Sequence, residues 1–600
     1  MSSEHSTSSF LVRNRAAIIA TIAAGTAAIG AGYYYYQLQQ QQTLYHGDEL
    51  SEEASSKKKK KKNQRKKKSA NAAQPIYPVN ESGEPDLEAK DSFTAEQKES
   101  YAMALKDKGN EFFKEQNYNE ALKFYNLALT LKQDPVFYSN ISACYVSLGQ
   151  LDKVVESSTK ALELKPDYSK ALLRRASANE NLENYADALF DLSVLSLNGD
   201  FNGASIEPML ERNLNKQAML VLKEKLGKNE KQLLPSDTSL ASFFGIFTVE
   251  TTFNNYDESS EADQELINGL VNLYKRSSAG YQNADSSFTK AAKLFEILLE
   301  ASPEDQIVKE KTAIALEHLG IFKFLRNDPL GAYDDIQKAI QLHPRVNSYI
   351  YGALIMADKG ESQEYFKNFE NALKLDPKSA AVYYHRGQMF FLTQQYDKAG
   401  ADFDKSKEYD ETNIFPYIQI ACLAYRENKF DDCETLFSEA KRKFPTAPEV
   451  PNFYAEVLTD KGDYDAALKQ YDIAKRLEES LEGIHVGVAP LVGKATLLAR
   501  NPIVENLLES TTLLEEACNL DPRSEQAKVG LAQLKLQQEE VEEAISLFEE
   551  AADLARNMDE KLQATTYAEA SKVQKKIRAD PVVNAKIQET LAAYREQGMM

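Results

Sequence analysis

Several residue types that define common folds are scarce in this chain. Its 600 residues contain 25 glycines, 19 prolines and no tryptophan. An all-β sandwich needs many tight turns, and a glycine-rich nucleotide-binding fold needs loops that approach phosphate closely, so both classes are disfavoured. The residues that remain are mostly helix formers. The composition therefore predicts an all-α protein.

Cysteine and histidine are also sparse. Four cysteines without close spacing in so long a chain exclude a disulfide scaffold and a zinc ribbon, and they favour a reducing compartment. The six histidines occur singly and form no HExxH or comparable ligand pattern. We therefore expect no metal centre and no cofactor. The four cysteines are Cys144, Cys422, Cys433 and Cys518.

The chain is acidic, but its charge is unevenly distributed. The net charge is −20, yet the first 92 residues hold 13 basic and 10 acidic side chains, which leaves −23 on the remainder. Nucleic-acid binding requires a basic face, so we do not expect it of that remainder. The acidic balance favours solubility and repels acidic partners at long range.

One uncharged segment near the amino terminus has the length of a membrane span. Residues 16–36 contain no charged side chain over 21 positions, which corresponds to about 30 Å of helix. The segment ends in the tyrosines Tyr33 to Tyr36, which suit a membrane interface. We predict a transmembrane anchor at 16–36, after a short segment at 1–15. A cleaved secretory signal is the competing interpretation, although its apolar core is usually only roughly 7 to 15 residues long.

The charges that flank this segment predict its orientation. Ten lysines and arginines lie between Lys57 and Lys68, against only Arg13 and Arg15 shortly before the span. This asymmetry predicts that the bulk of the chain stays in the cytosol. Residues 37–92 are rich in Gln, Lys, Ser and Glu and have no apolar period, so we predict a disordered basic stalk there.

An internal period of 33 or 34 residues runs through much of the remaining chain. Counted from unit starts at Ala102, Pro135 and Ser169, position 8 is always small, as expected where two helices cross. This pattern resembles the tetratricopeptide repeat, a pair of antiparallel helices. The same frame returns with starts at Ala313, Val346, Ala380, Ile414, Pro448, Leu491 and Glu525. With one degenerate unit before Pro303, we predict about eleven repeats in two arrays, forming an all-α superhelix.

The frame is lost between the two arrays, and this loss sets the predicted domain boundaries. We expect a three-repeat domain at 93–197, a partly helical connector at 198–263 and a carboxy-terminal repeat superhelix at 264–600. Helix after Met558 is expected to cap the last repeat. No stretch of roughly 100 residues remains for a catalytic domain, and no histidine lies near Ser236, Asp237 and Ser239 in the connector. We therefore predict that the protein is not an enzyme.

The first three repeats carry a set of polar residues on their first helices. Lys106 and Asn110 are four residues apart and share a helix face, as do Lys170 and Arg174 on the third repeat, while Asn140 occupies the second. Cations and amides that converge from three helices form a donor-rich site suited to paired carboxylates. Any one of these residues on its own would more often be merely solvated.

These five residues resemble the carboxylate clamp of co-chaperone tetratricopeptide domains. The resemblance rests on Gly109-Asn110, Tyr138-Ser139-Asn140, Lys165 to Lys170 and Arg174. It implies that the domain binds cytosolic heat-shock chaperones through carboxy-terminal tails that end in Glu-Glu-Val-Asp.

The complete arrangement of span, stalk, clamp domain and long superhelix resembles a family of mitochondrial outer-membrane import receptors for carrier precursors, particularly its fungal members. The resemblance implies a single-pass protein of the mitochondrial outer membrane that binds hydrophobic precursor proteins and passes them to the other translocase subunits. The alternative is a membrane-tethered co-chaperone or scaffold on another organelle, without precursor receptor activity.

A precursor site is harder to predict than the clamp. Positions 5, 6 and 9 of the later repeats are expected to face the groove, although ordinary packing between repeats would also place apolar residues there. His385 beside Arg386 is interpreted as a surface pair rather than a catalytic group. The candidate precursor-binding residues are Tyr384, His385, Gln388, Gln419 and Phe453.

Overall fold

A computed structural model of the chain describes residues 76–198, 203–227, 232–358 and 365–596. The predicted membrane span at 16–36 lies outside these residues, and none of the helices that are described combines the length and apolar character needed to cross a membrane. The structure describes residues 76–92, the end of the predicted stalk, and side chains of this segment pack against the first repeat. Tyr77 is buried and Leu87 lies against the same apolar cluster, so the prediction of disorder is wrong for residues 76–92.

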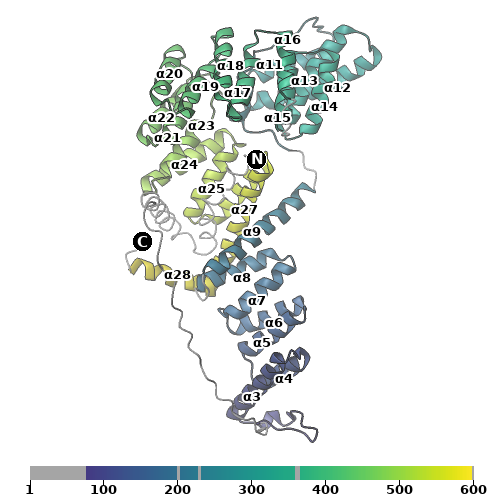
Figure 1. The fold of residues 1–600 in the computed structure, drawn as a ribbon, viewed down its shortest axis with the longest axis vertical. Helices are drawn as coiled ribbons and strands as arrows, with labels where there is room; N and C mark the ends of the chain where they lie inside the picture. The colour runs from purple at the N-terminus through teal and green to yellow at the C-terminus, as the bar shows by residue number, and fades with distance from the viewer. Residues whose placement is uncertain (1–75, 199–202, 228–231, 359–364, 597–600) are drawn as a thin grey trace. The chain divides into compact units, whose positions relative to one another are not determined.

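The described chain is all-α, as predicted, apart from one isolated bridge between Val79 and Pro85 (Figure 1). After a short 3-10 helix, Lys90–Ser92, the first three pairs are α3 (Ala95–Lys114) and α4 (Tyr118–Leu131), α5 (Pro135–Ser147) and α6 (Leu151–Leu164), and α7 (Ser169–Asn181) and α8 (Tyr185–Asn198). The connector holds α9 (Gly203–Leu226) and α10 (Asp237–Phe244).

Eight further pairs follow, which gives eleven in the described residues. They are α11 (Glu261–Leu273) and α12 (Ser278–Ala301), α13 (Gln306–Leu325) and α14 (Pro329–Leu342), α15 (Val346–Asp358) and α16 (Tyr365–Leu375), α17 (Ala380–Leu392) and α18 (Tyr396–Tyr409), α19 (Phe415–Arg426) and α20 (Phe430–Lys443), α21 (Glu449–Lys461) and α22 (Tyr464–Glu479), α23 (Ala489–Leu498) and α24 (Val504–Leu520), and α25 (Glu525–Gln537) and α26 (Val541–Leu554). The chain closes with α27 (Met558–Ala579) and α28 (Pro581–Glu596).

Within a pair, a large side chain of the second helix packs directly against the small residue at position 8 of the first helix. A Cβ atom added to Gly109 would lie 2.7 Å from the ring of Tyr125, and one added to Gly387 would lie 2.8 Å from the ring of Phe403. Both aromatic residues occupy position 24 of their repeats and are almost fully buried. The small residue therefore permits the close helix crossing that the period predicted.

A buried ion pair recurs at equivalent positions in both arrays. Arg175 forms two hydrogen bonds to Asp191, at 2.9 and 2.7 Å, and Arg386 forms two to Asp402, at 2.7 and 2.8 Å. Each arginine occupies position 7 and each aspartate position 23. Bidentate geometry and burial make these pairs directional, so they fix how the two helices of a repeat are aligned.

The turn inside each repeat uses one left-handed residue, a feature that the sequence analysis missed. Position 15 has a φ of 59° to 87° in eight repeats. Only two of the eight are glycine, the residue that takes this conformation without a Cβ penalty. These residues are Gln116, Gly149, Glu183, Asn327, Gln394, Asn428, Gly462 and Glu539.

The chain divides into two compact units, and its carboxy-terminal part belongs with its amino-terminal repeats. One unit comprises residues up to 224 together with 536–545 and 565–600, and the other comprises 225–535 and 546–564. In the first unit, α27 and α28 cover the apolar faces of α8 and α9: Val573, Ile577 and Ile587 are buried in one cluster with Leu192 and Leu210. Helix after Met558 therefore does more than cap the last repeat.

Candidate functional site

The predicted clamp residues lie on α3, α5 and α7, the first helices of three successive repeats. Polar caps define where two of these helices begin. Thr94 and Gln97 form a reciprocal capping box at the start of α3, and Asp134 accepts a hydrogen bond from the amide of Val136 at the start of α5. These caps set the residue at which each helix begins, and the polar clamp residues follow at fixed positions along the helix.

On α3, the two clamp residues already contact polar neighbours. The ammonium of Lys106 lies 2.7 Å from a carboxylate oxygen of Asp107. Asp107 is largely exposed, so this pair costs little to open. The hydroxyl of Tyr125 donates to Asn110 Oδ1 at 2.8 Å, and this bond restricts the orientation of the Asn110 amide.

Short contacts connect the three helices into one site. Asn140 Nδ2 lies 3.4 Å from Asn110 Oδ1, which joins α5 to α3. The guanidinium of Arg174 donates to the backbone carbonyl of Ser139 at 2.8 Å and to its hydroxyl at 2.6 Å, which joins α7 to α5. Asn110 Nδ2 also donates to Asp107 Oδ1 at 3.4 Å, and Asp107 in turn pairs with Lys106. Lys106, Asn110, Asn140 and Arg174 are therefore linked directly or through one neighbouring residue. Lys170 is exposed, one helical turn before Arg174 on α7.

The electrostatics of this site favour an incoming anion. Arg174 is half-buried, and burial lowers the pKa of its guanidinium, although arginine stays protonated at neutral pH. Among the described residues, its bonds go to neutral oxygens, and neither Arg174 nor Lys170 forms an ion pair with an acidic side chain. A carboxylate that reaches both cations would supply the missing negative charge.

Tyr125 is a contributor that the sequence analysis missed. It lies on the second helix of its repeat, so no argument about groove-facing positions selects it. Burial raises the pKa of its phenol, which keeps the hydroxyl protonated as a hydrogen-bond donor. The phenol donates to Asn110 Oδ1 and so fixes the amide with Nδ2 as its donor group. Among the described residues, that Nδ2 makes only a long contact of 3.4 Å to Asp107 Oδ1, which a ligand carboxylate would replace. The signal in the sequence was an aromatic residue 16 positions after the small Gly109.

Replacing Tyr125 by phenylalanine is expected to weaken tail binding without unfolding the domain. Loss of one neutral hydrogen bond costs about 1 kcal/mol, so the dissociation constant for a Glu-Glu-Val-Asp peptide should rise about fivefold. Isothermal titration with the full chain measures this change. Tyr118→Phe is the matched control, because Tyr118 is on the same helix and makes no described hydrogen bond to a clamp residue. Equal affinity of Tyr125→Phe and wild type would contradict a positioning role.

The predicted precursor residues lie in the second unit, on α17, α19 and α21. Tyr384 is fully buried, and Gln388 donates to its hydroxyl at 3.1 Å. Burial raises the pKa of Tyr384, and a hydrogen bond with Gln419 opposes this shift, so these three residues form one polar cluster. Phe453 is partly buried against a separate apolar cluster formed by α19, α20 and α21.

The prediction of a surface pair at His385 is wrong. His385 is only 3% exposed, and burial lowers its pKa to about 4. Its ring stacks on the ring of Phe247 from the connector, with centroids 4.9 Å apart. Arg386 is not its partner, because Arg386 pairs with Asp402 inside the repeat. The connector's position could not be read from a repeat frame that it does not follow.

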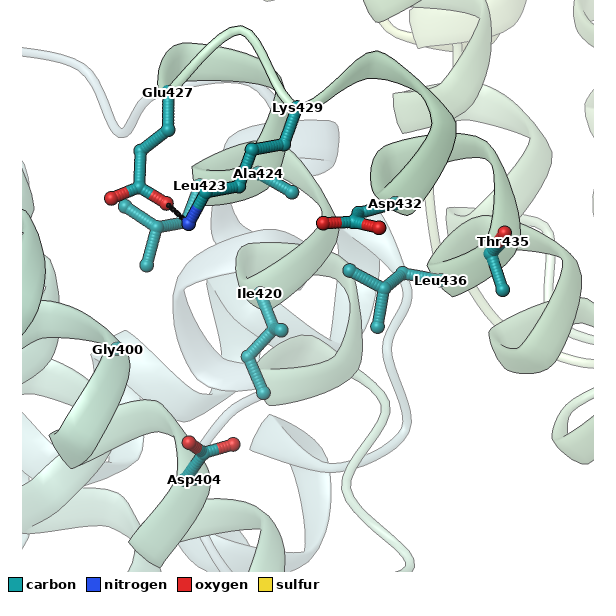
Figure 2. Close-up of a pocket in the computed structure, with 10 residues that line it drawn as sticks. All are labelled: Gly400, Asp404, Ile420, Leu423, Ala424, Glu427, Lys429, Asp432, Thr435 and Leu436. Atoms are coloured by element: carbon teal, nitrogen blue, oxygen red, sulfur yellow. Dashed lines mark hydrogen bonds and ion pairs between the residues drawn. The ribbon is translucent and has the colours of Figure 1, made fainter.

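One described cavity lies away from both predicted sites. A pocket of about 430 Å³ opens between α18, α19 and α20, and Figure 2 shows its lining. Ile420, Leu423 and Leu436 form an apolar part, while Glu427 and Lys429 pair with each other at the rim, 2.9 Å apart. None of the predicted precursor residues lines it. In the described part of the chain, no group of three or more His, Cys, Asp and Glu side chains is placed to hold a metal ion.

Comparisons with known proteins agree with the repeat architecture. The tetratricopeptide-repeat family matches residues 136–168, 367–411 and 418–479. The chain is 66% identical to the mitochondrial import receptor subunit TOM70 of Saccharomyces cerevisiae, over 99% of this chain and 100% of that relative. It is 27% identical to the human protein of the same name, over 79% of this chain and 80% of the relative. The crystal structure of yeast Tom70 superposes with a TM-score of 0.59 at 72% identity, covering 82% of this chain and all of that one.

Proposed function

Because the chain belongs to the TOM70 family of mitochondrial import receptor subunits, we propose that it is a non-enzymatic import receptor of the mitochondrial outer membrane. It docks cytosolic chaperones through the clamp on α3, α5 and α7. It also binds the hydrophobic precursors that these chaperones deliver, and it passes them to the other subunits of the translocase.

The observation that carries this proposal is the donor set of the first unit. Lys106, Asn110, Asn140, Lys170 and Arg174 are all hydrogen-bond donors, three of them positively charged, and contacts across α3, α5 and α7 hold four of them together. A chaperone tail that ends in Asp presents a side-chain and a terminal carboxylate within a few ångströms of each other. Two such anions match this set better than a single charge does.

The proposal assigns precursor binding to the second unit and membrane attachment to residues 16–36. Positions 5, 6 and 9 of the second unit's repeats carry both polar and apolar side chains, such as Gln388, Gln419 and Phe453, a mixture that suits apolar segments of varied sequence. The uncharged 21-residue segment and the basic run after it support a single-pass anchor with the bulk of the chain in the cytosol.

Import of a carrier precursor tests this function directly. Mitochondria that lack their own receptor of this family should regain chaperone-dependent import of a radiolabelled carrier when they carry the full chain. They should regain it only partly when they carry Arg174→Ala. Alkaline extraction should leave the full chain in the membrane pellet and release a version that starts at Asp91.

Two results would contradict the proposal. If the full chain restores no import although it is membrane-bound, the receptor function is wrong. A tail peptide that still binds in that case would favour a tethered co-chaperone without receptor activity. If alkaline extraction releases the full chain as readily as the truncated version, the membrane-spanning assignment at 16–36 is wrong.

A further inference from the structure

The second unit holds a segment of its own chain against the first helices of its repeats. Residues 246–254, here called the strap, follow α10 without helix or strand structure. Strap side chains contact Tyr351 on α15, His385 on α17 and Arg345 at the start of α15. Tyr351 and His385 both occupy position 6 of their repeats, one of the positions expected to face the groove. The strap therefore covers part of the surface that was assigned to precursors.

The first anchor of the strap is aromatic. Phe247 lies with its ring centroid 4.9 Å from that of Tyr351 and 4.9 Å from that of His385, where it stacks with an interplanar angle of 27°. It is only 4% exposed. Two successive repeats thus form an aromatic slot that takes one phenyl ring.

The second and third anchors of the strap, Glu250 and Phe253, each contact a basic side chain that also pairs with a carboxylate of the repeats. Glu250 accepts a hydrogen bond from Arg345 at 2.6 Å, but Arg345 also pairs with the fully buried Glu317 at 3.2 Å. Phe253 lies under the ammonium of Lys311, which also pairs with the buried Asp263 at 2.5 Å. If the strap left, Arg345 would still pair with Glu317 and Lys311 would still pair with Asp263. Displacing the strap therefore avoids the usual free-energy penalty for an unpaired buried charge.

The strap backbone makes few hydrogen bonds. Among the described contacts, no backbone group from Thr248 to Tyr256 pairs with another backbone group. The remaining links to the repeats are bonds from the hydroxyl of Tyr274 to the carbonyl of Thr248 and from Asn413 Nδ2 to the carbonyl of Ile246, and a long contact of 3.5 Å between Asn254 Nδ2 and Glu310. Val249 is 57% exposed. A cavity of about 290 Å³ is lined by the strap residues Thr252, Phe253 and Asn254 and by Leu270 and Ile314 of the repeats. Few backbone bonds and a gap beneath the segment are features of a weakly held element.

The surface under the strap also contains a buried polar side chain whose hydrogen-bonding atoms have no partner among the described residues. Neither ring nitrogen of the buried His385 makes a hydrogen bond. Gln388 opposes the lowering of the His385 pKa by burial, but its amide donates to the hydroxyl of Tyr384 at 3.1 Å. Phe247, which covers the imidazole, carries no polar group in its side chain. A ligand that placed an aromatic ring in the slot and a polar atom beside the imidazole would satisfy what the strap leaves unpaired.

We propose that the strap is an intramolecular occupant of a binding groove on α13, α15 and α17, and that the groove takes non-helical apolar segments of other proteins when the strap is displaced. Its ligand class is read from the occupant: a non-helical segment with two aromatic side chains six residues apart and a polar or acidic residue between them. The inference rests on the proposed receptor function only for the identity of the incoming segment, a hydrophobic precursor.

A synthetic peptide with the sequence of the strap, residues 246–254, is the probe for displacement. In the full chain, the attached strap has the advantage of high effective concentration, so the fluorescently labelled peptide should bind wild type weakly. It should bind the loosened variant Glu250→Gln/Phe253→Ala at least tenfold more tightly. Phe247→Ala, which empties the aromatic slot, is an independent second variant and should show the same direction of change.

Val249→Ala is the matched control, because this strap residue points to solvent, and it should bind the peptide as wild type does. Helical melts establish that each variant is folded. Limited proteolysis of the wild-type chain with chymotrypsin should cut after the strap residues Phe247 and Phe253 faster at saturating peptide. Equal peptide affinity of wild type and both folded variants, or an unchanged rate of cleavage in the strap, would overturn the inference.

A carrier precursor segment then separates this inference from the receptor function. The segment should compete with the strap peptide for the loosened variant. If precursor crosslinks equally to wild type and to the loosened variant and never competes with the strap peptide, the receptor function stands and the strap inference is wrong. If the strap peptide binds the loosened variant and no precursor crosslinks to any version, the strap inference stands and the receptor function is wrong.

Discussion

Arg174→Ala is expected to weaken binding of a Glu-Glu-Val-Asp peptide about 10- to 150-fold, with no loss of helicity. A hydrogen bond to a charged group contributes about 1.5–3 kcal/mol, and each 1.4 kcal/mol corresponds to about a factor of ten in affinity. Arg174 is partly buried, and among the described residues it bonds only to neutral oxygens of Ser139. An incoming carboxylate would therefore give its positive charge a direct negative partner. Isothermal titration with the full chain measures the change.

Two controls separate a specific contact from a general loss of positive charge. Lys160→Ala removes an exposed cation of α6 that pairs with Glu156 and should leave affinity unchanged. Amidating the carboxy terminus of the peptide removes one of its two anions and should cost about as much as Arg174→Ala. Equal affinity of wild type and Arg174→Ala would show that the tail does not use this site.

Removing residues 565–600 is expected to unfold the chaperone-docking unit while the second unit stays folded. The truncation uncovers α8 and α9, because it removes the buried side chains Val573, Ile577, Val583 and Ile587. Burial of such side chains contributes roughly 1.5–3 kcal/mol each. The total loss, roughly 6–12 kcal/mol, is comparable to the whole stability of a domain. Tail binding should disappear, and urea denaturation should lose one of two transitions.

A single substitution offers the same test with a matched control. Ile577 is 2% exposed, so Ile577→Ala should lower the stability of the first unit by about 2–5 kcal/mol. Val582 is 53% exposed, five residues farther along the chain, and Val582→Ala should have little effect. If both variants unfold at the urea concentration of wild type, the carboxy-terminal helices do not stabilise the unit.

The features predicted correctly from the sequence are those that repeat locally. Small residues at position 8 predicted the helix crossings, and the close approach of Gly109 to Tyr125 confirms them. The eleven helix pairs follow from the same period. The left-handed turn residue escaped prediction because most repeats use Gln, Glu or Asn there, and these residues are also common within helices. Backbone strain of this kind has no unique sequence mark.

Contacts between distant segments were not predictable from the period. The strap lies in a region where the repeat frame is lost, and its partner His385 is more than one hundred residues away. Ile577 similarly packs with residues more than 350 positions earlier. A local pattern specifies which face of a helix is apolar, but it does not specify which segment covers that face. For this reason the clamp residues could be selected by spacing, whereas Tyr125 and the cover over His385 could not.

The discontinuous first unit has a consequence for the order of synthesis. Residues up to 224 leave the ribosome first, yet the carboxy-terminal segment that completes their apolar surface begins at residue 565. At roughly 5–20 residues per second, translation of the 340 residues in between takes roughly 20–70 s. The second unit, which lacks only residues 546–564 once 225–535 has emerged, can fold during that interval. The nascent chain therefore displays an unfinished chaperone-docking unit until translation ends, and chaperones are available to it throughout that time.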